Sequence, residues 1–370
     1  MNFIINGKEL FNNLNIVSHG ISNKNIIPIL SGIKFNLTNK DLILTTYNSD
    51  IIIINKIPSK NIKEINDIGS IVIPGKYIID IIRKSINEDI KIEILDGLKL
   101  LIKTKNYESK LNGMNSEDFP NLDIKLNKEP IIIKTNDLLN IINQTAFAAS
   151  ESETKPVLTG VNLIINNNKI EAIATDLHRL AKKSITIPNN INNIINIVIP
   201  SKNLIELKSI LPEINEDIKI HLFENKIIFQ FNNILFQSKL INSTYPNTDQ
   251  TIPKTSSIII KLEKDELYNA LDRVSLISNE HKIKLNIQNN KLIISSGNLE
   301  LGNAIEKIKI NKNNEEDLTI TLNSKYFMES LKVFNNNEIE LHFNNNNQPI
   351  LIKDSKDETM IQLLLPIITI

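Results

Sequence analysis

The chain has 370 residues, which is too long for one ordinary hydrophobic core and fits two or three domains of about 100 to 200 residues. Hydrophobic residues make up 41% of it and only 10 residues are glycine, so collagen-like and wholly disordered classes are excluded. Its 42 basic residues balance 42 acidic ones, so a nucleic-acid partner would have to meet a local positive patch, and the absence of cysteine excludes disulfide scaffolds and thiolate metal sites.

The N-terminal segment carries no sign of export. Met1 to Lys8 lacks a basic stretch followed by about 7 to 15 apolar residues. The longest apolar runs, such as Ile51 to Ile54, are too short to span a bilayer. We therefore expect a cytoplasmic protein with no membrane partner.

The first third of the chain predicts a helix, a hairpin and a second helix. Apolar residues recur at helical spacing over 10–17, and they alternate over 33–44 on either side of a polar turn. The segment 71–83 then predicts a strand that leads through Pro74 into an amphipathic helix. This mixture of helices and antiparallel strands is typical of an α+β domain.

The same elements recur twice along the rest of the chain. Pro200 follows Pro74 by 126 residues, and Asn323 follows Pro200 by 123, each between a strand pattern and a helix pattern. The first helix and the alternating strands recur in step, at 138–142 with 161–173 and at 267–274 with 283–294. A repeat of this length is long enough for a domain and too long for a solenoid unit.

Three tandem copies of one domain follow from the repeat. Polar, proline-containing stretches at 121–130 and 245–254 mark the breaks between copies. We expect domains at 1–126, 127–253 and 254–370, each with helices on one face of antiparallel sheets. Asn-rich runs such as Asn344 to Asn347 are expected at hairpin turns.

The second helix of each copy carries a regular row of charges. Each row begins with a lysine in the first turn, where the helix dipole favours anions by about 0.3 to 1 kcal/mol. One interpretation is a row of cations that faces a polyanion, and the alternative is a solvated face on which lysine and acid neutralise each other. The opposite face is apolar and includes Ile79, Ile205 and Met328. The rows are Lys76-Asp80-Arg83, Lys202-Glu206-Ser209 and Lys325-Glu329-Lys332.

No catalytic constellation stands out. The densest polar cluster, Thr175 to Leu180, invites interpretation as an acid/base or metal site. The five histidines fall in no metal-ligand spacing, and neither a phosphate-binding glycine loop nor a nucleophile elbow occurs. We expect no enzyme activity, no cofactor and no metal, and a hydrolase centred on Asp176 and His178 remains an alternative.

Six segments of the chain resemble those of one bacterial family, the β sliding clamp, which is the processivity subunit of DNA polymerase III, and most of all its Gram-positive type. The resemblance runs essentially end to end and lies in the order and spacing of the segments. They are 27–32 (IPILSG), 118–120 (DFP), 152–160 (SETKPVLTG), 174–181 (ATDLHRLA), 245–246 (YP) and 363–367 (LLLPI).

The resemblance implies a head-to-tail homodimeric ring whose helices line a central hole. Such a ring encircles double-stranded DNA independently of sequence and tethers the replicative DNA polymerase through its alpha-type subunit. The clamp loader and repair polymerases would be further partners. The alternative from another class is a β-rich repeat surface or adhesion protein, against which the lack of an export signal argues.

The resemblance also implies two sets of site residues. The family presents basic residues to DNA at the positions of Lys24 and Lys76, and Lys155 lies in a loop that resembles its DNA-facing protrusion. We add Arg83, Lys202 and Lys332 as further DNA-facing candidates. A groove for short peptide motifs would be built from Leu158, Thr175, Leu177, His178, Arg179, Leu180, Pro246, Leu363, Leu365, Pro366 and Ile367. The chain departs from the family near Gln250 and Ile368, where basic residues are common, and at Leu177, where a small residue is common.

Overall fold

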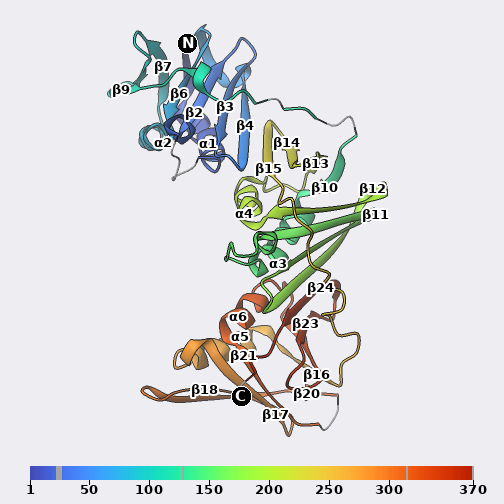
Figure 1. Ribbon diagram of the computed structural model, residues 1–370. Helices are drawn as coiled ribbons and strands as arrows, with labels where there is room; N and C mark the ends of the chain where they lie inside the picture. The colour runs from blue at the N-terminus through green and yellow to red at the C-terminus, as the bar shows by residue number, and fades with distance from the viewer. Residues whose placement is uncertain (22–26, 123, 127–128, 314–315, 369–370) are drawn as a thin grey trace. The chain divides into compact units, whose positions relative to one another are not determined.

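The computed structural model describes residues 1–370 except 22–26, 123, 127–128, 314–315 and 369–370 (Figure 1). The chain forms two compact units, Met1–Thr135 with Asn203–Leu240, and Asn136–Lys202 with Ile241–Ile370. The middle third of the chain therefore contributes strands to both units. In the described parts, every helix is too short or too polar to cross a bilayer.

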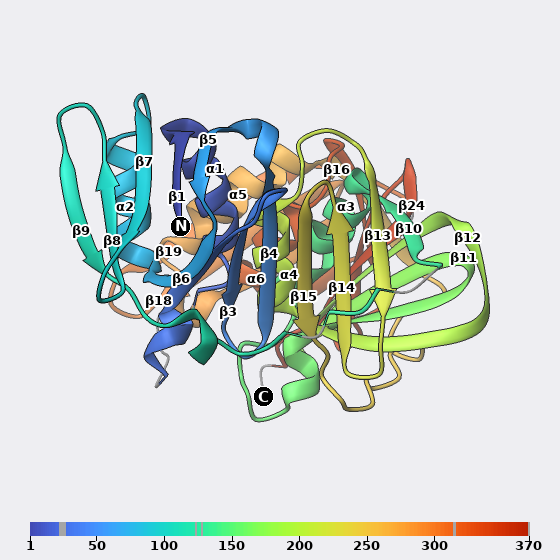
Figure 2. The same ribbon diagram turned by 90° about the horizontal axis from the view of Figure 1, so that it is seen from above.

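The first unit is built on two antiparallel sheets. Figure 2 shows β3, β4, β15, β14 and β13 side by side in the larger one. The larger sheet has the order β10 (Ile131–Lys134), β13 (Asp217–Leu222), β14 (Lys226–Phe231), β15 (Ile234–Lys239), β4 (Ile51–Pro58), β3 (Asp41–Tyr47), β2 (Gly32–Leu37) and β6 (Gly69–Pro74). The smaller has the order β5 (Ile62–Asp67), β1 (Asn2–Asn6), β7 (Asp89–Leu95), β8 (Lys99–Lys103) and β9 (Glu108–Asn112).

Two helices of this unit, α1 (Gly7–Ser18) and α2 (Gly75–Lys84), pack on each other and on strands of the larger sheet. The side chain of Asn6 accepts the N–H groups of Lys8 and Glu9 and so caps the start of α1. The apolar residues of α1 that the sequence singles out are fully buried. A third helix, α4 (Ser201–Ile210), follows β12.

The second unit also contains two antiparallel sheets. One has the order β11 (Gly160–Thr175), β12 (Arg179–Pro200), β24 (Asp357–Leu364), β23 (Ile350–Asp354), β22 (Glu338–Phe343), β16 (Ile258–Glu263) and β20 (Asn311–Lys312). The other has the order β19 (Gly302–Lys309), β18 (Lys291–Asn298), β17 (Lys282–Gln288) and β21 (Leu318–Asn323).

The helices of this unit are α3 (Thr135–Thr145), α5 (Lys264–Ser275) and α6 (Ser324–Leu331). Figure 1 shows α5 and α6 together beside the strands, and the two helices pack on each other and on strands of both sheets. The core beneath them includes Leu271 and Phe327, both fully buried. Asn323 accepts the N–H of Tyr326 and caps α6.

Each unit contains one antiparallel pairing between strands from neighbouring thirds of the chain, which we call a strand joint. In the first unit β4 pairs with β15 through five residues, starting at Ile51, and in the second β12 pairs with β24 through five residues, starting at Arg179. Ile51 and Arg179 are 128 positions apart and each opens its strand. Each joint links one third of the chain to the next by an antiparallel ladder, so the threefold repeat extends to the connections between copies.

The α+β fold with three copies of a helix-and-strand repeat is confirmed, and two local expectations are corrected. Ile205 is 48% exposed, because the buried face of α4 instead carries Leu204, Leu207 and Ile210. The alternation over 161–173 forms one strand, β11, whose register against β12 shifts at Asn167, where the backbone has a φ of 51°.

Candidate functional site

A cavity of about 130 Å³ lies in the second unit, where β11 turns into β12 and where β24 ends. Seven of the eleven predicted groove residues line it, together with three residues that follow Pro246. Apolar side chains with a few polar groups between them suit a ligand that is anchored by hydrophobic contacts. The lining is Thr175, Leu177, Arg179, Leu180, Pro246, Asn247, Thr248, Thr251, Leu363 and Leu365.

The turn between β11 and β12 shapes one wall of this cavity. The carboxylate of Asp176 accepts the N–H groups of His178 and Arg179 at 2.9 and 3.0 Å. The hydroxyl of Thr175 donates to the carbonyl of Arg179 and accepts the N–H of Leu177. Leu177 sits at the tip with a φ of 74° and is 49% exposed. The turn therefore holds an apolar side chain open to solvent at the cavity wall.

Arg179 is the most constrained side chain of the cavity and is only 8% exposed. Its guanidinium donates to Asp176 at 3.0 Å, to the carbonyl of Phe147 at 2.6 Å and to the carboxylate of Glu329. It also lies over the ring of Tyr326, 4.4 Å from the centroid. A buried charge is tolerated only when it is paired and hydrogen-bonded, and these contacts meet that condition.

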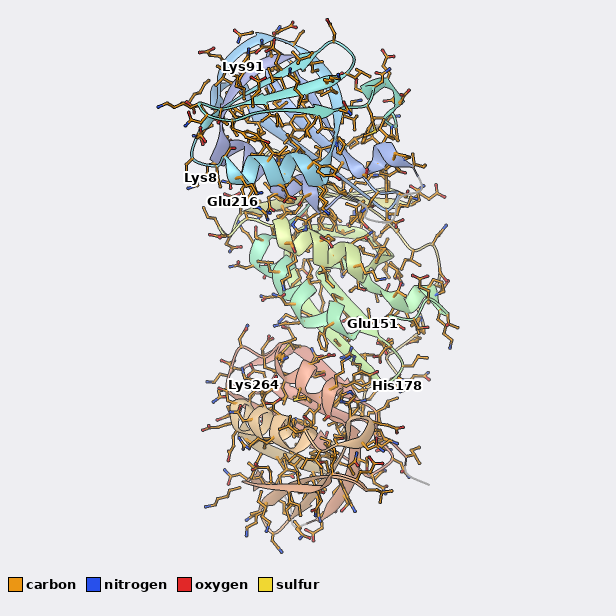
Figure 3. The ribbon with its side chains drawn as sticks, turned by 90° about the vertical axis from the view of Figure 1, so that its left-hand side faces the viewer. Lys8, Lys91, Glu151, His178, Glu216 and Lys264 are labelled. Carbon is orange, nitrogen blue, oxygen red and sulfur yellow. The ribbon has the colours of Figure 1, made fainter. Side chains whose placement is uncertain are left out.

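His178 lies on the same turn and faces α6 (Figure 3). Its ring stacks on that of Tyr326, with centroids 6.3 Å apart, and its carbonyl accepts the N–H of Leu365. Burial raises the pKa of the Tyr326 hydroxyl, and the negative charge of Asp176 raises it further. Asp176 is bound by the turn backbone and by Arg179, so it acts as a structural anchor of the turn.

Three predicted groove residues lie next to the cavity without lining it. Leu158 is buried in an apolar cluster with Tyr245 and Leu363, directly beneath the lining. Pro366 and Ile367 follow β24 and are half-buried, and the N–H of Ile367 donates to the carbonyl of Thr321 at 2.8 Å. The end of the chain is thus tied to β21.

The predicted DNA-facing cations differ from one another in position and in pairing. Lys24 lies outside the described residues. Lys76 and Lys202 are exposed in the first turns of α2 and α4, and Lys155 is exposed on the loop before β11. Lys332 is exposed directly after α6 and lies over the ring of Tyr268, while Arg83 is paired with Asp80 at 2.8 Å.

The acid of each charge row is bound by a partner other than the lysine that precedes it. Asp80 binds Arg83, Glu206 binds the ring of His19 at 2.6 Å, and Glu329 binds Arg179. Among the described side chains, the leading lysines 76, 202 and 325 form no salt bridge. The rows are therefore not neutralised by lysine–acid pairs, and each first-turn lysine keeps its charge available.

Nothing in the described parts of the chain groups three or more His, Asp or Glu side chains as a metal site would require. Comparison with known proteins assigns the chain to a family. Three family models for the DNA polymerase III beta subunit match along the chain, the N-terminal domain at 1–123, the central domain at 132–247 and the C-terminal domain at 249–368.

The chain belongs to the family of bacterial β sliding clamps. A curated β sliding clamp of Staphylococcus epidermidis is 36% identical over 376 residues, and one of Staphylococcus aureus is 35% identical, each with full coverage of both chains. The crystal structure of the sliding clamp from Bacillus subtilis matches with a TM-score of 0.94 at 34% identity and covers both chains fully. The predicted Gram-positive resemblance is confirmed.

The chain is thus a DNA sliding clamp, the processivity subunit of DNA polymerase III, and not an enzyme. Family membership decides against both the surface-protein and the hydrolase alternatives. Sequence reasoning missed some residues of the clamp that lie at the cavity. Asn247, Thr248 and Thr251 follow the predicted Pro246 and could have been found by extending that motif, whereas Tyr326 and Glu329 come from a distant helix.

Proposed function

We propose that this clamp works as a homodimeric ring that encircles double-stranded DNA without reading its sequence. The observation that carries the proposal is the threefold placement of an exposed, unpaired lysine in the first turn of α2, α4 and α6. A ring that holds DNA by enclosure needs only a few exchangeable phosphate contacts and no base contacts. The zero net charge fits weak contacts of this kind. Each repeat, 1–126, 127–253 and 254–370, would supply one domain, acting in the cytoplasm.

The test of this DNA face is retention on circular DNA. Replacing Lys76, Lys202 and Lys325 with alanine should weaken retention on a closed plasmid and reduce its salt dependence, because each lost phosphate contact lowers the salt slope by about 0.9. A control replaces three exposed strand lysines, Lys56, Lys219 and Lys284. Cutting the plasmid should release wild-type clamp, and equal retention on cut and closed plasmid would contradict enclosure.

The cavity beside the β11–β12 turn is the proposed groove for partner peptides. A short motif of Gln and hydrophobic residues, from the alpha-type polymerase subunit, the clamp loader or repair polymerases, would place an apolar side chain between Leu177, Leu180 and Leu365. Leu365 is half-buried and lines the cavity, whereas Ile368 is exposed and does not.

A pair of substitutions tests the groove. Leu365→Ser should weaken binding of a fluorescein-labelled peptide of Gln, Leu and Phe residues by about tenfold, because it removes apolar surface worth about 1 to 2 kcal/mol. Ile368→Ser is the matched control. Fluorescence anisotropy gives both affinities, and equal binding by the two variants would reject the groove.

The proposed dimer would form through two open sheet edges. Among the strands that the structure describes, β9 pairs only with β8 and β19 only with β18, so each presents one unpaired row of backbone groups. Exposed apolar side chains accompany both edges, Leu98 and Tyr107 near β9, and Leu299 and Ile305 near or on β19. Head-to-tail pairing of β9 with β19 of a second copy would cover both edges and close a ring.

A further inference from the structure

Glu329 lies on α6 and does not line the cavity, yet its carboxylate binds the one guanidinium that does. The equivalent acids of the other two repeats, Asp80 and Glu206, bind Arg83 and His19. Neither of those partners lines the cavity beside the β11–β12 turn. In the third repeat, therefore, the helix acid Glu329 contacts a residue that lines the groove.

Arg179 links Glu329 to the cavity wall, because it binds Glu329 and itself lines the cavity. A guanidinium is planar and presents its N–H donors in a fixed fork, so each acceptor that it binds restricts its orientation. Asp176 holds it from the turn, Phe147 from the short 3-10 helix after α3 and Glu329 from α6. Without Glu329, one N–H group of a buried cation would lack its charged acceptor, and the guanidinium would turn to find another.

Such a reorientation of the guanidinium would displace the wall of the groove. Asp176 anchors the guanidinium and, through its other carboxylate oxygen, the N–H groups of His178 and Arg179. The same turn carries Leu177 in the cavity lining. A change at Glu329 therefore reaches the apolar wall through two hydrogen-bonded steps.

We propose that Glu329 is a positioning residue of the peptide groove, which fixes the guanidinium of Arg179 and thereby the turn that carries Leu177. The inference rests on the groove proposed above. A salt bridge that only fastened α6 to β12 would lower the unfolding temperature when broken but would leave the peptide affinity of the folded clamp unchanged.

The experiment compares Glu329→Gln with Glu206→Gln in the full-length clamp. Both remove one carboxylate at the same position of a repeat. We expect Glu329→Gln to weaken binding of the fluorescein-labelled peptide of Gln, Leu and Phe residues by about fivefold to twentyfold, since a charge-assisted hydrogen bond is lost. Glu206→Gln should bind as the wild type does. Thermal melts show that each variant is folded at the assay temperature, and Glu329→Asp, with an intermediate loss expected, replaces Glu329→Gln if it is not.

A double-mutant cycle separates positioning from a general structural effect. Arg179→Ala weakens binding directly, and in that background Glu329→Gln should add no further loss, because Glu329 acts through Arg179. Wild-type affinity in Glu329→Gln, or losses that multiply in the double variant, would overturn the inference while Leu365→Ser still supported the groove. Absence of peptide binding by the wild type would overturn the groove and this inference together.

Discussion

Leu177 has a backbone conformation that bulky residues rarely adopt. Its φ of 74° falls in the left-handed region, which costs a residue with a Cβ about 1 to 2 kcal/mol. The hydrogen bonds of Thr175 and Asp176 hold the turn in that conformation. The sequence alone could indicate the turn from its polar residues, but it could not indicate the strain, because Leu itself favours other conformations.

Two substitutions at Leu177 separate this strain from its apolar contact. Asn tolerates the left-handed region and Ala does not, and both remove most of the apolar side chain. We expect Leu177→Asn to be about 1 kcal/mol more stable than Leu177→Ala in urea unfolding. Both variants should bind the labelled peptide more weakly than the wild type does. If Ala were as stable as Asn, the strain assigned to this position would be absent.

At the scale of elements, local patterns predicted what lies close in sequence. The helical spacing of 10–17 and 267–274 gave α1 and α5, because one face of each helix is buried. The ladders β4–β15 and β12–β24 could not be predicted this way, since they join strands that are more than 170 residues apart. The contact of Arg179 with Glu329, separated by 150 positions, was missed for the same reason.

The β12–β24 ladder carries a charge pair between a buried lysine and a half-buried carboxylate, and the loss of this pair can be measured. Lys183 is buried and donates to Asp357 at 2.7 Å. Burial alone would raise the pKa of Asp357, but hydrogen bonds from Lys183 and Thr359 outweigh it, so this pKa is lowered. A lowered carboxyl pKa stabilises the fold at neutral pH, and the stabilisation is lost as the pH falls below about 4.

Asp357→Asn should therefore destabilise the second unit by about 1 kcal/mol at pH 7, after allowance for solvent screening. The difference from the wild type should shrink as the pH is lowered through the carboxyl range. Urea unfolding at pH 7 and at pH 3 measures it. A difference that stayed constant or grew toward pH 3 would contradict the assignment. Asp249→Asn, at an exposed carboxylate, is the control.

At the scale of the whole molecule, the internal repeat predicted three similar helix-and-strand copies, and the family resemblance predicted a homodimeric ring. The order of the motifs placed the chain in its family, because it holds from 27–32 to 363–367. The open edges are visible only in the sheets. β9 and β19 resemble other strands in sequence, and only the sheet order shows that each lies at the end of its sheet.

The dimer can be tested at the exposed apolar residues of the third repeat. Leu299 is exposed next to β19, and Ile305 is 57% exposed on β19. Replacing both with aspartate should shift the clamp from dimer to monomer in analytical ultracentrifugation, because charges would be buried in the joint. It should also abolish retention on closed plasmid. Ile194→Asp, at an exposed residue of β12, is the control, and a double variant that stayed dimeric would exclude this edge.

The two strand joints inside each chain have a mechanical consequence. A peptide backbone spans each of them, so a segment that detaches there stays tethered and can re-pair at a high effective concentration. A junction between two separate molecules has no such tether across it. In the proposed dimeric ring, a gap wide enough to admit a duplex would therefore open at a junction between subunits, while the other junction still holds the two chains together.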